Sequence, residues 1–471
     1  MRMRLRTPCA LALLAGLTGL AACTSGPAAH PPTPPHSATS VPTSSSPAAS
    51  PSAPVLVATD WTQYHGNGAR TGVAAGMPAA TQLGIRWTAS LGGAVYGQPL
   101  VIGNTVVAAT EQDEVFGLDL ATGAVRWRIS VGTPASASEQ PCGNISPLGV
   151  TSTGVYDPQT GLIYLVAQSG SSEHLLVGIN PATGSEEFRQ NVPSPDHQPF
   201  YDQQRGALAL DGGSVDVVFG GHYGDCGPYI GSVVAMPVSG QGAVHSYLVP
   251  TAKQGGIWAS GGPVVGPDGT IYVGTGNGAP TQGPYDGSDS VTALTPELSR
   301  TGIFAPTDWH TLSADDLDLG SMSPALLPDG QILQVGKSAT GYLLNAAHLG
   351  GVGGQVAAGP VCAAFGGAAI SGSIVYVPCV TGLAAVDTAG SRIAVIWRGP
   401  ADGWGSPVIG GGAVWVAGPD SGVLYELSPA TGKVEHQLKV APALPHFASP
   451  SLSGSLVLVG TLTGVTAVSG G

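Results

Sequence analysis

A pattern of short strands and glycine-rich turns recurs along the chain and constrains its fold more than any other feature. Each copy opens with a small residue and continues with an alternating strand, a glycine-rich turn, two further strands and a Thr-Gly turn. The clearest copies are GQPLVIGNTVVAATEQDEVFGLDLATGAVRW from Gly97 and GSPVIGGGAVWVAGPDSGVLYELSPATGKVEH from Gly405. Such self-similarity indicates a repeat architecture, in which each unit buries its apolar face against its neighbours.

Eight copies can be counted along the sequence. The other six open near Ser146-Pro147, Gly206-Ala207, Gly262-Pro263, Ser323-Pro324, Gly367-Ala368 and Ser449-Pro450. Each copy spans roughly 40 to 60 residues and holds about four strands with two-residue periodicity, which is typical of a propeller blade. The last copy has only three strands, whereas 83–91 is a lone strand ahead of the first copy. We therefore predict an all-β, eight-bladed β-propeller over 59–471, closed by pairing of that lone strand with the last blade.

The first 58 residues have a different character. Residues 1–22 read as a secretory signal, with three early arginines before a short apolar stretch. The signal ends in Leu-Ala-Ala before Cys23, which resembles the lipobox of bacterial lipoproteins and implies an acylated cysteine; a plain signal-peptidase site is the alternative. Residues 23–58 are almost entirely Ser, Thr, Pro and Ala, with too little apolar surface to offset the entropy of ordering. We expect an exported chain, lipid-anchored by a flexible tether to the outer face of the cytoplasmic membrane.

Charge and motif content exclude several classes of function. The formal net charge is −13, so the basic footprint that a nucleic-acid partner requires is missing. The histidines form no H-x-x-x-H or H-E-x-x-H set, which leaves a zinc hydrolase without support. The sequence also contains no G-x-S-x-G elbow before a predicted helix and no Walker-type loop.

Four cysteines follow Cys23, an even number that suits an oxidising compartment. They are Cys142, Cys226, Cys362 and Cys379. Three pairings are open to them, and four unpaired buried thiols are the alternative.

Several of the repeat's features resemble a known family. DWTQYHGNGARTG at 60–72, Ala-Thr-Gly turns in three copies, and Trp87 and Trp127 on predicted outer strands resemble the pyrroloquinoline-quinone (PQQ) propeller repeat. The resemblance covers about 60–471. That family includes quinoprotein alcohol dehydrogenases, polyvinyl-alcohol-dehydrogenase-like proteins and the non-catalytic barrel-assembly lipoprotein of outer membranes. Its repeats specify a fold and leave the activity open.

Three stretches resemble the polyvinyl-alcohol-type branch more closely. IYVGTGNGAP at 271–280 resembles the segment in which an asparagine coordinates calcium, which places Asn277 near a metal. DDLDLGSMSPALLPDG at 315–330 looks like the acidic stretch that opens the next blade. VGKSATGYLLN places Lys337 where a basic residue faces the quinone.

The resemblance implies a role for each of five residues. Asn277 and Asp318 would bind calcium, Asp316 or Asp318 would be the catalytic base, and Lys337, Asn277 and Trp258 would contact PQQ. These residue types suit the chemistry, because a quinone with carboxylates needs a hard cation with oxygen ligands and an alcohol needs a carboxylate base. Each also has a plainer explanation: a left-handed turn for Asn277, loop capping for the aspartates, a solvated Lys337, and inter-blade packing for Trp258.

The resemblance also bears on the cysteines. CGNISPLGVTSTGVYD and GGHYGDCGPYIGSVVAM resemble paired cysteine segments of that branch. In a four-stranded blade the loop that enters the blade and the loop between its second and third strands open on one face. All four cysteines fall in loops of these two kinds, so we predict the bridges Cys142–Cys226 and Cys362–Cys379 on the face that carries Asn277.

Two hypotheses of function follow. The first is a surface-tethered binding scaffold whose loop-rich face engages a cell-wall polymer or a protein partner. The alternative is an alcohol or sugar dehydrogenase that depends on PQQ and calcium. The sequence has no adjacent cysteine pair and no C-x-x-C-H haem motif, and only Asp225 stands near the place of the family's glutamate ligand. Convergence of Asn277, an aspartate of 316–318 and Lys337 on one pocket would favour the dehydrogenase.

Overall fold

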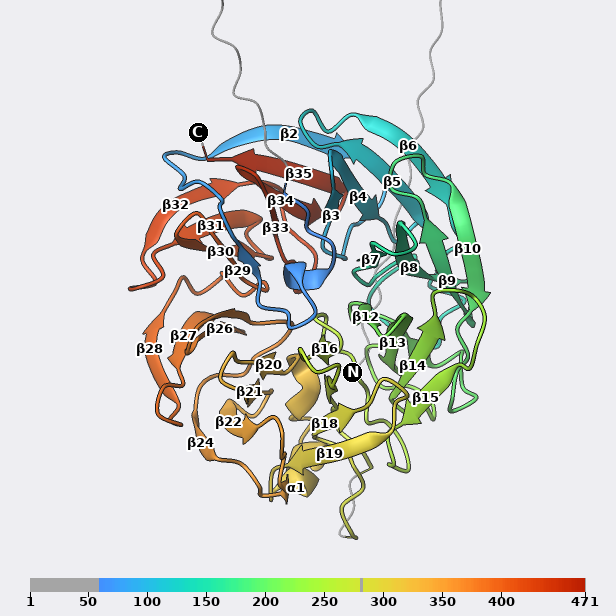
Figure 1. The fold of residues 1–471 in the computed structure, drawn as a ribbon, viewed down its shortest axis with the longest axis vertical. Coiled ribbons are helices and arrows are strands. Elements are labelled where there is room, and N and C mark those ends of the chain that lie inside the picture. Colours follow the sequence, from blue (N-terminus) through green and yellow to red (C-terminus); the bar gives the residue numbers. More distant parts are fainter. Residues whose placement is uncertain (1–58, 280–282, 471) are drawn as a thin grey trace, which may run out of the picture. The chain divides into compact units, whose positions relative to one another are not determined.

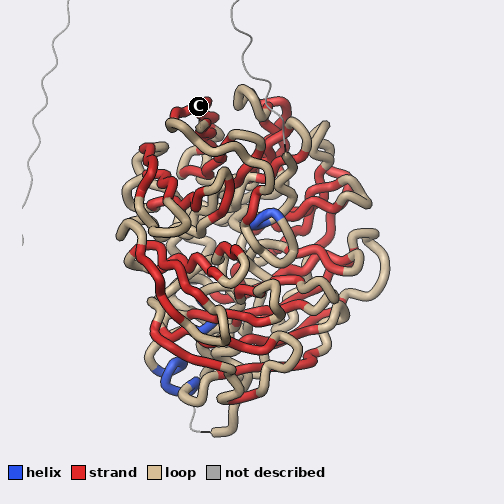
Figure 2. Tube along the Cα trace, turned by 60° about the vertical axis from the view of Figure 1, so that its left-hand side comes forward, coloured by secondary structure: helices blue, strands red, loops and turns tan. Residues whose placement is uncertain are grey.

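The strands form a ring of eight antiparallel sheets. The structure is a computed structural model that describes residues 59–279 and 283–470. The sheets follow one another around a centre (Figure 1), and helix is confined to short segments (Figure 2). The predicted eight-bladed propeller is confirmed. Cys23 and the predicted signal and tether lie outside the described residues.

Each blade runs from a short inner strand to a longer outer strand. Blade 1 contains β3 (Leu100–Ile102), β4 (Thr105–Ala109), β5 (Glu114–Asp119) and β6 (Val125–Ser130), and blade 2 contains β7 (Val155–Asp157), β8 (Leu162–Ser169), β9 (Glu173–Ile179) and β10 (Glu186–Asn191). Blade 3 contains β11 (Asp202–Gln203), β12 (Ala209–Asp211), β13 (Ser214–Gly221), β14 (Ser232–Pro237) and β15 (His245–Leu248). Blade 4 contains β16 (Val264–Val265), β17 (Ile271–Gly274), β18 (Val291–Leu294) and β19 (Arg300–Ala305), with β23 (Gly351–Val352) parallel to β19.

The remaining blades repeat the pattern. Blade 5 contains β20 (Ala325–Leu326), β21 (Gln331–Val335), β22 (Thr340–Asn345) and β24 (Ala357–Pro360), and blade 6 contains β25 (Ala369–Ser371), β26 (Ile374–Cys379), β27 (Gly382–Asp387) and β28 (Ala394–Arg398). Blade 7 contains β29 (Val408–Gly410), β30 (Ala413–Gly418), β31 (Val423–Leu427) and β32 (Val434–Lys439), with β1 (Val73–Ala74) parallel to β29. Blade 8 contains β33 (Ser451–Ser453), β34 (Leu456–Thr461), β35 (Gly464–Ser469) and β2 (Gly84–Ser90).

Burial along the strands explains the sequence pattern. The middle strands are buried almost throughout, as in β8 and β13, because both faces of a blade pack against neighbouring blades. The outer strands β10 and β32 alternate between half-buried and exposed residues, because only one of their faces meets the core. Middle strands therefore read as apolar runs, whereas outer strands carry the charged residues.

The ring closes as predicted. β2 pairs antiparallel with β35 from Gly84 opposite Ser469 to Ser90 opposite Gly464, so the first long strand completes the last blade (Figure 1). Closure leaves neither end of the ring as an open edge.

Tryptophans on outer strands join consecutive blades. The Trp87 ring of blade 8 lies over Gly123 in the Ala-Thr-Gly turn of blade 1, and its Nε1–H donates to the Leu120 carbonyl at 2.9 Å. Trp127 lies in the same way over Gly184 of blade 2. A Cβ on Gly123 would fall 2.5 Å from the indole, and its φ of 71° is left-handed, so glycine is required on both counts.

The segment 60–72 fills the centre of the ring, which the sequence did not predict. It contains the 3-10 turn η1 (Tyr64–Gly66), and His65 is fully buried, with Nδ1 3.0 Å from the Ala368 carbonyl and Nε2 3.0 Å from Ser449 Oγ. Arg70 donates to the carbonyls of Pro263 and Leu208 on other blades. This segment, here called the plug, ties several inner strands together.

Two local expectations need adjustment. The loop into blade 2 is longer than its Ser146-Pro147 opening suggested, and β7 begins only at Val155. The helix α1 (Trp309–Ala314) and the 3-10 turn η2 (Leu319–Ser321) flank the acidic stretch where no helix was predicted. None of the helices in the described part of the chain is long and apolar enough to cross a membrane.

Candidate functional site

A cavity of about 470 Å³ opens at the mouth of the central channel. Its walls come from loops that enter blades, here called entry loops, and from loops between second and third strands, here called 2–3 loops. These are the two loop types that the sequence placed on one face. Trp258, Asn277, Asp316, Asp318 and Lys337, the five residues proposed from sequence, all line this cavity.

Lys337 is the centre of a charged cluster. Its Nζ lies 2.8 Å from Asp316 Oδ1 and 2.5 Å from Asp318 Oδ2. Burial alone would lower the pKa of Lys337, but the two carboxylates outweigh burial and raise it. Lys337 is therefore a charged, partly buried side chain, and its Nζ also lies 5.7 Å from the centre of the Trp258 ring.

Asn277 is fastened to the same carboxylates. Its backbone N–H donates to Asp318 Oδ1 at 2.7 Å, and its Nδ2 donates to Asp316 Oδ1 at 2.8 Å. Its side-chain oxygen is buried and has no hydrogen-bond partner among the described residues. Asn277 does not adopt a positive φ, so the left-handed-turn explanation is wrong; Asp316 has that conformation instead, with φ 56°.

The two aspartates differ in their surroundings. The Asp316 side chain is 70% exposed, whereas that of Asp318 is 9% exposed. Burial raises the pKa of Asp318 above its usual range, although Lys337 acts in the opposite direction. Of the two, Asp318 is the buried carboxylate that a general base requires, because a raised pKa brings a base closer to neutral pH.

Asp289 holds the loop that carries Asp318. Its Oδ1 accepts from the Leu319 backbone N–H at 3.0 Å and its Oδ2 accepts from Ser313 Oγ at 2.7 Å. Burial raises the pKa of Asp289 to about 7. Glycine is required at Gly276, because a Cβ there would lie 2.0 Å from Asp318 Oδ1.

The part of the cavity lining next to Lys337 is aromatic and carries an arginine. Phe365 and Phe447 are stacked, with ring centres 5.6 Å apart and planes 11° apart, and Trp258 packs on both. The Arg205 guanidinium lies 5.1 Å from the centre of Phe447 and 5.9 Å from that of Trp258. Trp258 thus packs between blades, as its plainer explanation held, and also faces the cavity.

The 2–3 loop of blade 3 supplies a third group of polar side chains. Asp225 accepts a hydrogen bond from Tyr229 Oη at 2.6 Å, and burial together with Asp225 raises the pKa of Tyr229 well above its usual range. His222 is 3% exposed, and neither ring nitrogen has a hydrogen-bond partner among the described residues. Burial lowers the pKa of His222 to about 4, so the ring is neutral at pH 7.

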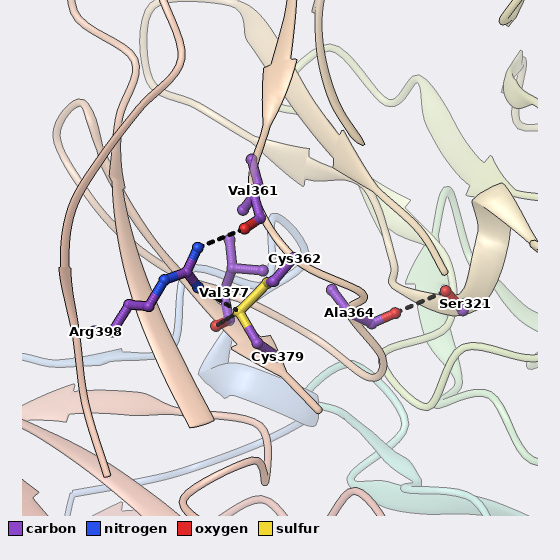
Figure 3. The surroundings of a disulfide bond; sticks show 7 residues. All are labelled: Ser321, Val361, Cys362, Ala364, Val377, Cys379 and Arg398. Atoms are coloured by element: carbon purple, nitrogen blue, oxygen red, sulfur yellow. Dashed lines mark hydrogen bonds between the residues drawn. A yellow bond between two sulfur atoms is a disulfide. The ribbon is translucent and has the colours of Figure 1, made fainter. Parts of the chain in front are cut away.

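Both predicted disulfides are present. Cys142–Cys226 joins the entry loop of blade 2 to the 2–3 loop of blade 3, the two loops that bring Asn144 and Asp225 to the cavity. Cys362–Cys379 closes the entry loop of blade 6 against the end of β26 (Figure 3).

The second bridge lies beside the loop that carries Phe365. In the same loop the Ala364 carbonyl accepts a hydrogen bond from Ser321 Oγ at 2.7 Å, as Figure 3 shows. Ser321 belongs to η2, directly after Asp318, so this contact links the aromatic wall to the acidic cluster.

The donor set suits a hard cation and a flat acidic cofactor. The Asn277 amide oxygen, which has no partner in the part of the chain that the structure describes, and the carboxylates of Asp316 and Asp318 are oxygen donors of the kind that calcium takes. Within 59–279 and 283–470 no three His, Cys, Asp or Glu side chains are grouped to hold a metal by themselves, so the amide would be needed as the third ligand. A flat ring system would find Trp258 to stack on.

Sequence reasoning missed part of this site. Arg205, His222, Tyr229, Phe365 and Phe447 carry no recognisable motif, and Asp225 was noted only for its position near an expected glutamate. Proximity to cysteine was the available signal for two of them, because His222 and Asp225 lie just ahead of Cys226.

The chain resembles known proteins in sequence and in fold. The family model described as "Outer membrane protein assembly factor BamB" matches residues 42–281. No curated protein sequence matches the chain. A quinohemoprotein alcohol dehydrogenase from Comamonas testosteroni is 17% identical, with a TM-score of 0.66 over 87% of this chain and 80% of that one.

Two further solved structures are similar. A europium-containing methanol dehydrogenase is 16% identical, with a TM-score of 0.65 over 87% of this chain and 97% of that one. BamB from Moraxella catarrhalis is 14% identical, with a TM-score of 0.56 over 82% of this chain and 99% of that one. At such identities the likeness shows the fold alone.

Proposed function

Because the chain belongs to the PQQ-repeat β-propeller family, we propose that its channel-mouth cavity binds a quinone cofactor with a divalent cation and oxidises an alcohol or a sugar. The observation that carries the proposal is the convergence of Asn277 and Lys337 on Asp318, each within hydrogen-bonding distance of its carboxylate, at a single cavity. These side chains come from three different loops, so their meeting reflects the tertiary structure and not sequence proximity.

Each side chain has a definite part in this proposal. The Asn277 oxygen and the Asp318 carboxylate would hold the cation, and Trp258 would support the flat face of the cofactor. Bound PQQ would supply the two-electron acceptor. Asp318 would accept the substrate's hydroxyl proton, because it is the buried carboxylate of the pair at the cavity wall. Lys337 would place positive charge beside the cofactor oxygens as they gain electrons.

A binding scaffold is the second candidate, and two observations favour it. The first is that the matching family model carries the description of an outer membrane protein assembly factor. The second is that the face with the cavity presents apolar side chains to solvent. Tyr223, Val380 and Leu462 are 68%, 48% and 43% exposed, and all three lie in 2–3 loops. Tyrosine is enriched at the centre of protein–protein interfaces, so Tyr223 is the side chain that most favours a protein partner.

Export and anchoring complete the proposal. The lipobox at Cys23 and the tether would hold the propeller at the outer face of the cytoplasmic membrane. Both disulfides accord with such an oxidising compartment.

Calorimetric titration of the purified chain with PQQ, with and without calcium, tests the proposed function. We expect micromolar or tighter binding that requires calcium. Asn277→Ala and Lys337→Ala should each weaken it by about ten-fold or more, since each removes a contact to a charged group. Asn104→Ala, on an exposed turn between β3 and β4, is the matched control and should leave binding unchanged.

The two candidates give different outcomes. Binding that is lost in the site variants and retained in the control would justify assaying alcohols and sugars with an artificial electron acceptor. Absence of binding at high micromolar PQQ would end the dehydrogenase proposal and leave the scaffold.

A further inference from the structure

Two cationic side chains line the cavity, and only one of them is paired with carboxylates. Lys337 is neutralised by the carboxylates of Asp316 and Asp318. Arg205, which lies near the same Trp258 ring as Lys337, makes no ion pair or hydrogen bond with any described residue, and its Nε is buried without an acceptor. A guanidinium has five N–H donors, so an arginine left in this way at a cavity wall costs free energy unless a ligand supplies acceptors.

The aromatic side chains hold the Arg205 guanidinium in place but do not accept its hydrogen bonds. The guanidinium lies over Phe447 and Trp258, whose faces attract a cation but accept none of its in-plane hydrogen bonds. Phe447 has a φ of 60°, an uncommon conformation for a bulky residue. The result is a preorganised cation whose N–H groups remain available to a ligand.

Glu111 is the acidic neighbour of Arg205 and does not neutralise it. The Glu111 Oε2 accepts from the Gly149 N–H at 2.8 Å and from Thr151 Oγ1 at 3.1 Å, and no ion pair to Arg205 forms. Burial raises the pKa of Glu111 to about 7, so its negative charge is incomplete at neutral pH.

His222 provides an independent second observation on the same cavity. It lines the cavity, is almost fully buried, and both of its nitrogens lack a hydrogen-bond partner among the described residues. The Asp202 backbone acts on the ring and raises the pKa of His222 against the larger effect of burial, although no hydrogen bond of normal geometry forms between the two. Buried polar side chains are nearly always hydrogen-bonded, so an imidazole with two free nitrogens at a cavity wall indicates a polar ligand group beside it.

We propose that Arg205 and His222 form an anion subsite that receives a carboxylate of the bound ligand. A carboxylate is planar and accepts two parallel hydrogen bonds from a guanidinium, which the Lys337 ammonium, already paired with two carboxylates, could not offer. A neutral imidazole adds one further donor. The ligand would thus place its acidic group on the Arg205 side of the cavity and its hydroxyl or carbonyl group on the Asp318 side.

The carboxylate could belong to the cofactor or to an acidic substrate, and one probe separates these sources. Benzoate combines a carboxylate with a ring that fits the Phe365–Phe447 wall, and benzyl alcohol is its uncharged match. Ligand-observed NMR measures the affinity of both for the full chain, first alone and then with PQQ and calcium present.

We expect benzoate to bind the wild-type chain and benzyl alcohol to bind more weakly. Arg205→Gln should weaken benzoate by about ten-fold or more, because a charge-assisted pair is lost. Arg205→Lys should retain part of the affinity. Arg86→Gln, which removes the same charge from an exposed position on β2, should have no effect. Melting temperatures of the variants establish that they are folded.

Each outcome is informative. Displacement of benzoate by PQQ assigns the subsite to the cofactor's carboxylate, and simultaneous binding assigns it to the substrate's. If PQQ does not bind but benzoate binds through Arg205, the subsite stands while the proposed quinone function falls. The subsite is refuted if benzoate does not bind the wild-type chain, or if it binds Arg205→Gln as tightly.

Discussion

Replacing Gly276 with alanine tests the geometry of the acidic cluster at a single atom. The new Cβ would lie 2.0 Å from Asp318 Oδ1, whereas an ordinary C···O contact is about 3.3 Å, so the carboxylate must retreat by more than about 1 Å. That movement breaks the 2.7 Å hydrogen bond from the Asn277 N–H. Backbone strain does not contribute, because Gly276 is outside the left-handed region.

The expected loss of stability follows from these contacts. A hydrogen bond to a charged acceptor contributes about 1.5–3 kcal/mol, and the lower entropy of the unfolded alanine chain offsets about 0.4–1 kcal/mol. The net destabilisation is therefore about 0.5–2.6 kcal/mol. For a domain of roughly 400 residues this lowers the melting temperature by about 0.6–3 °C.

Thermal unfolding and PQQ titration measure the two consequences. Gly84→Ala is the matched control: Gly84 lies at an exposed strand end, has no positive φ, and a Cβ there would meet nothing within 4 Å. We expect Gly276→Ala to melt earlier and bind more weakly, and Gly84→Ala to match the wild type. Wild-type melting together with wild-type affinity in Gly276→Ala would refute the assigned position of Asp318.

Three further predictions address the scaffold around the site. Replacing Cys142 and Cys226 with serine should lower the free energy of unfolding by about 4.6 kcal/mol, and replacing Cys362 and Cys379 should lower it by about 3.1 kcal/mol. The difference arises because the first bridge closes a loop of 84 residues and the second a loop of 17. Equal losses in denaturant unfolding would contradict this account. Burial raises the pKa of Asp113 to about 8, so the folded chain keeps a proton that the unfolded chain releases near pH 4, and stability should fall as pH rises from about 6.5 to 8. Below about pH 6.5 the buried histidines make stability rise with pH, since burial lowers the pKa of His222 to about 4. Asp113→Asn should flatten the decline of the melting temperature between about pH 6.5 and 8. An unchanged slope would exclude Asp113 as the source of that decline. Trp87→Phe removes the hydrogen bond to the Leu120 carbonyl and should destabilise the closed ring by about 1–3 kcal/mol in denaturant unfolding; unchanged stability would mean that this indole does not fasten blade 8 to blade 1.

The sequence alone determined the architecture of the ring. Each blade is predicted by local signals, namely two-residue alternation and glycine turns, and blades 1, 6 and 8 add a tryptophan on the outer strand. The lone strand at 83–91 and the incomplete last copy together specified closure, which β2 and β35 confirm. The residues alone left three disulfide pairings open, and the pairing that the structure confirms was predicted with the help of the family resemblance of the segments around Cys142 and Cys226.

Only the tertiary structure decided what fills the ring and what faces the cavity. The plug at 60–72 has no strand or helix period, and it is ordered by hydrogen bonds from His65 and Arg70 to blades that lie far along the chain. Arg205 and His222 likewise have no local signature. Their significance lies in the hydrogen-bond partners that they lack among the described residues, and such a lack depends on how distant loops close around a side chain without offering it an acceptor.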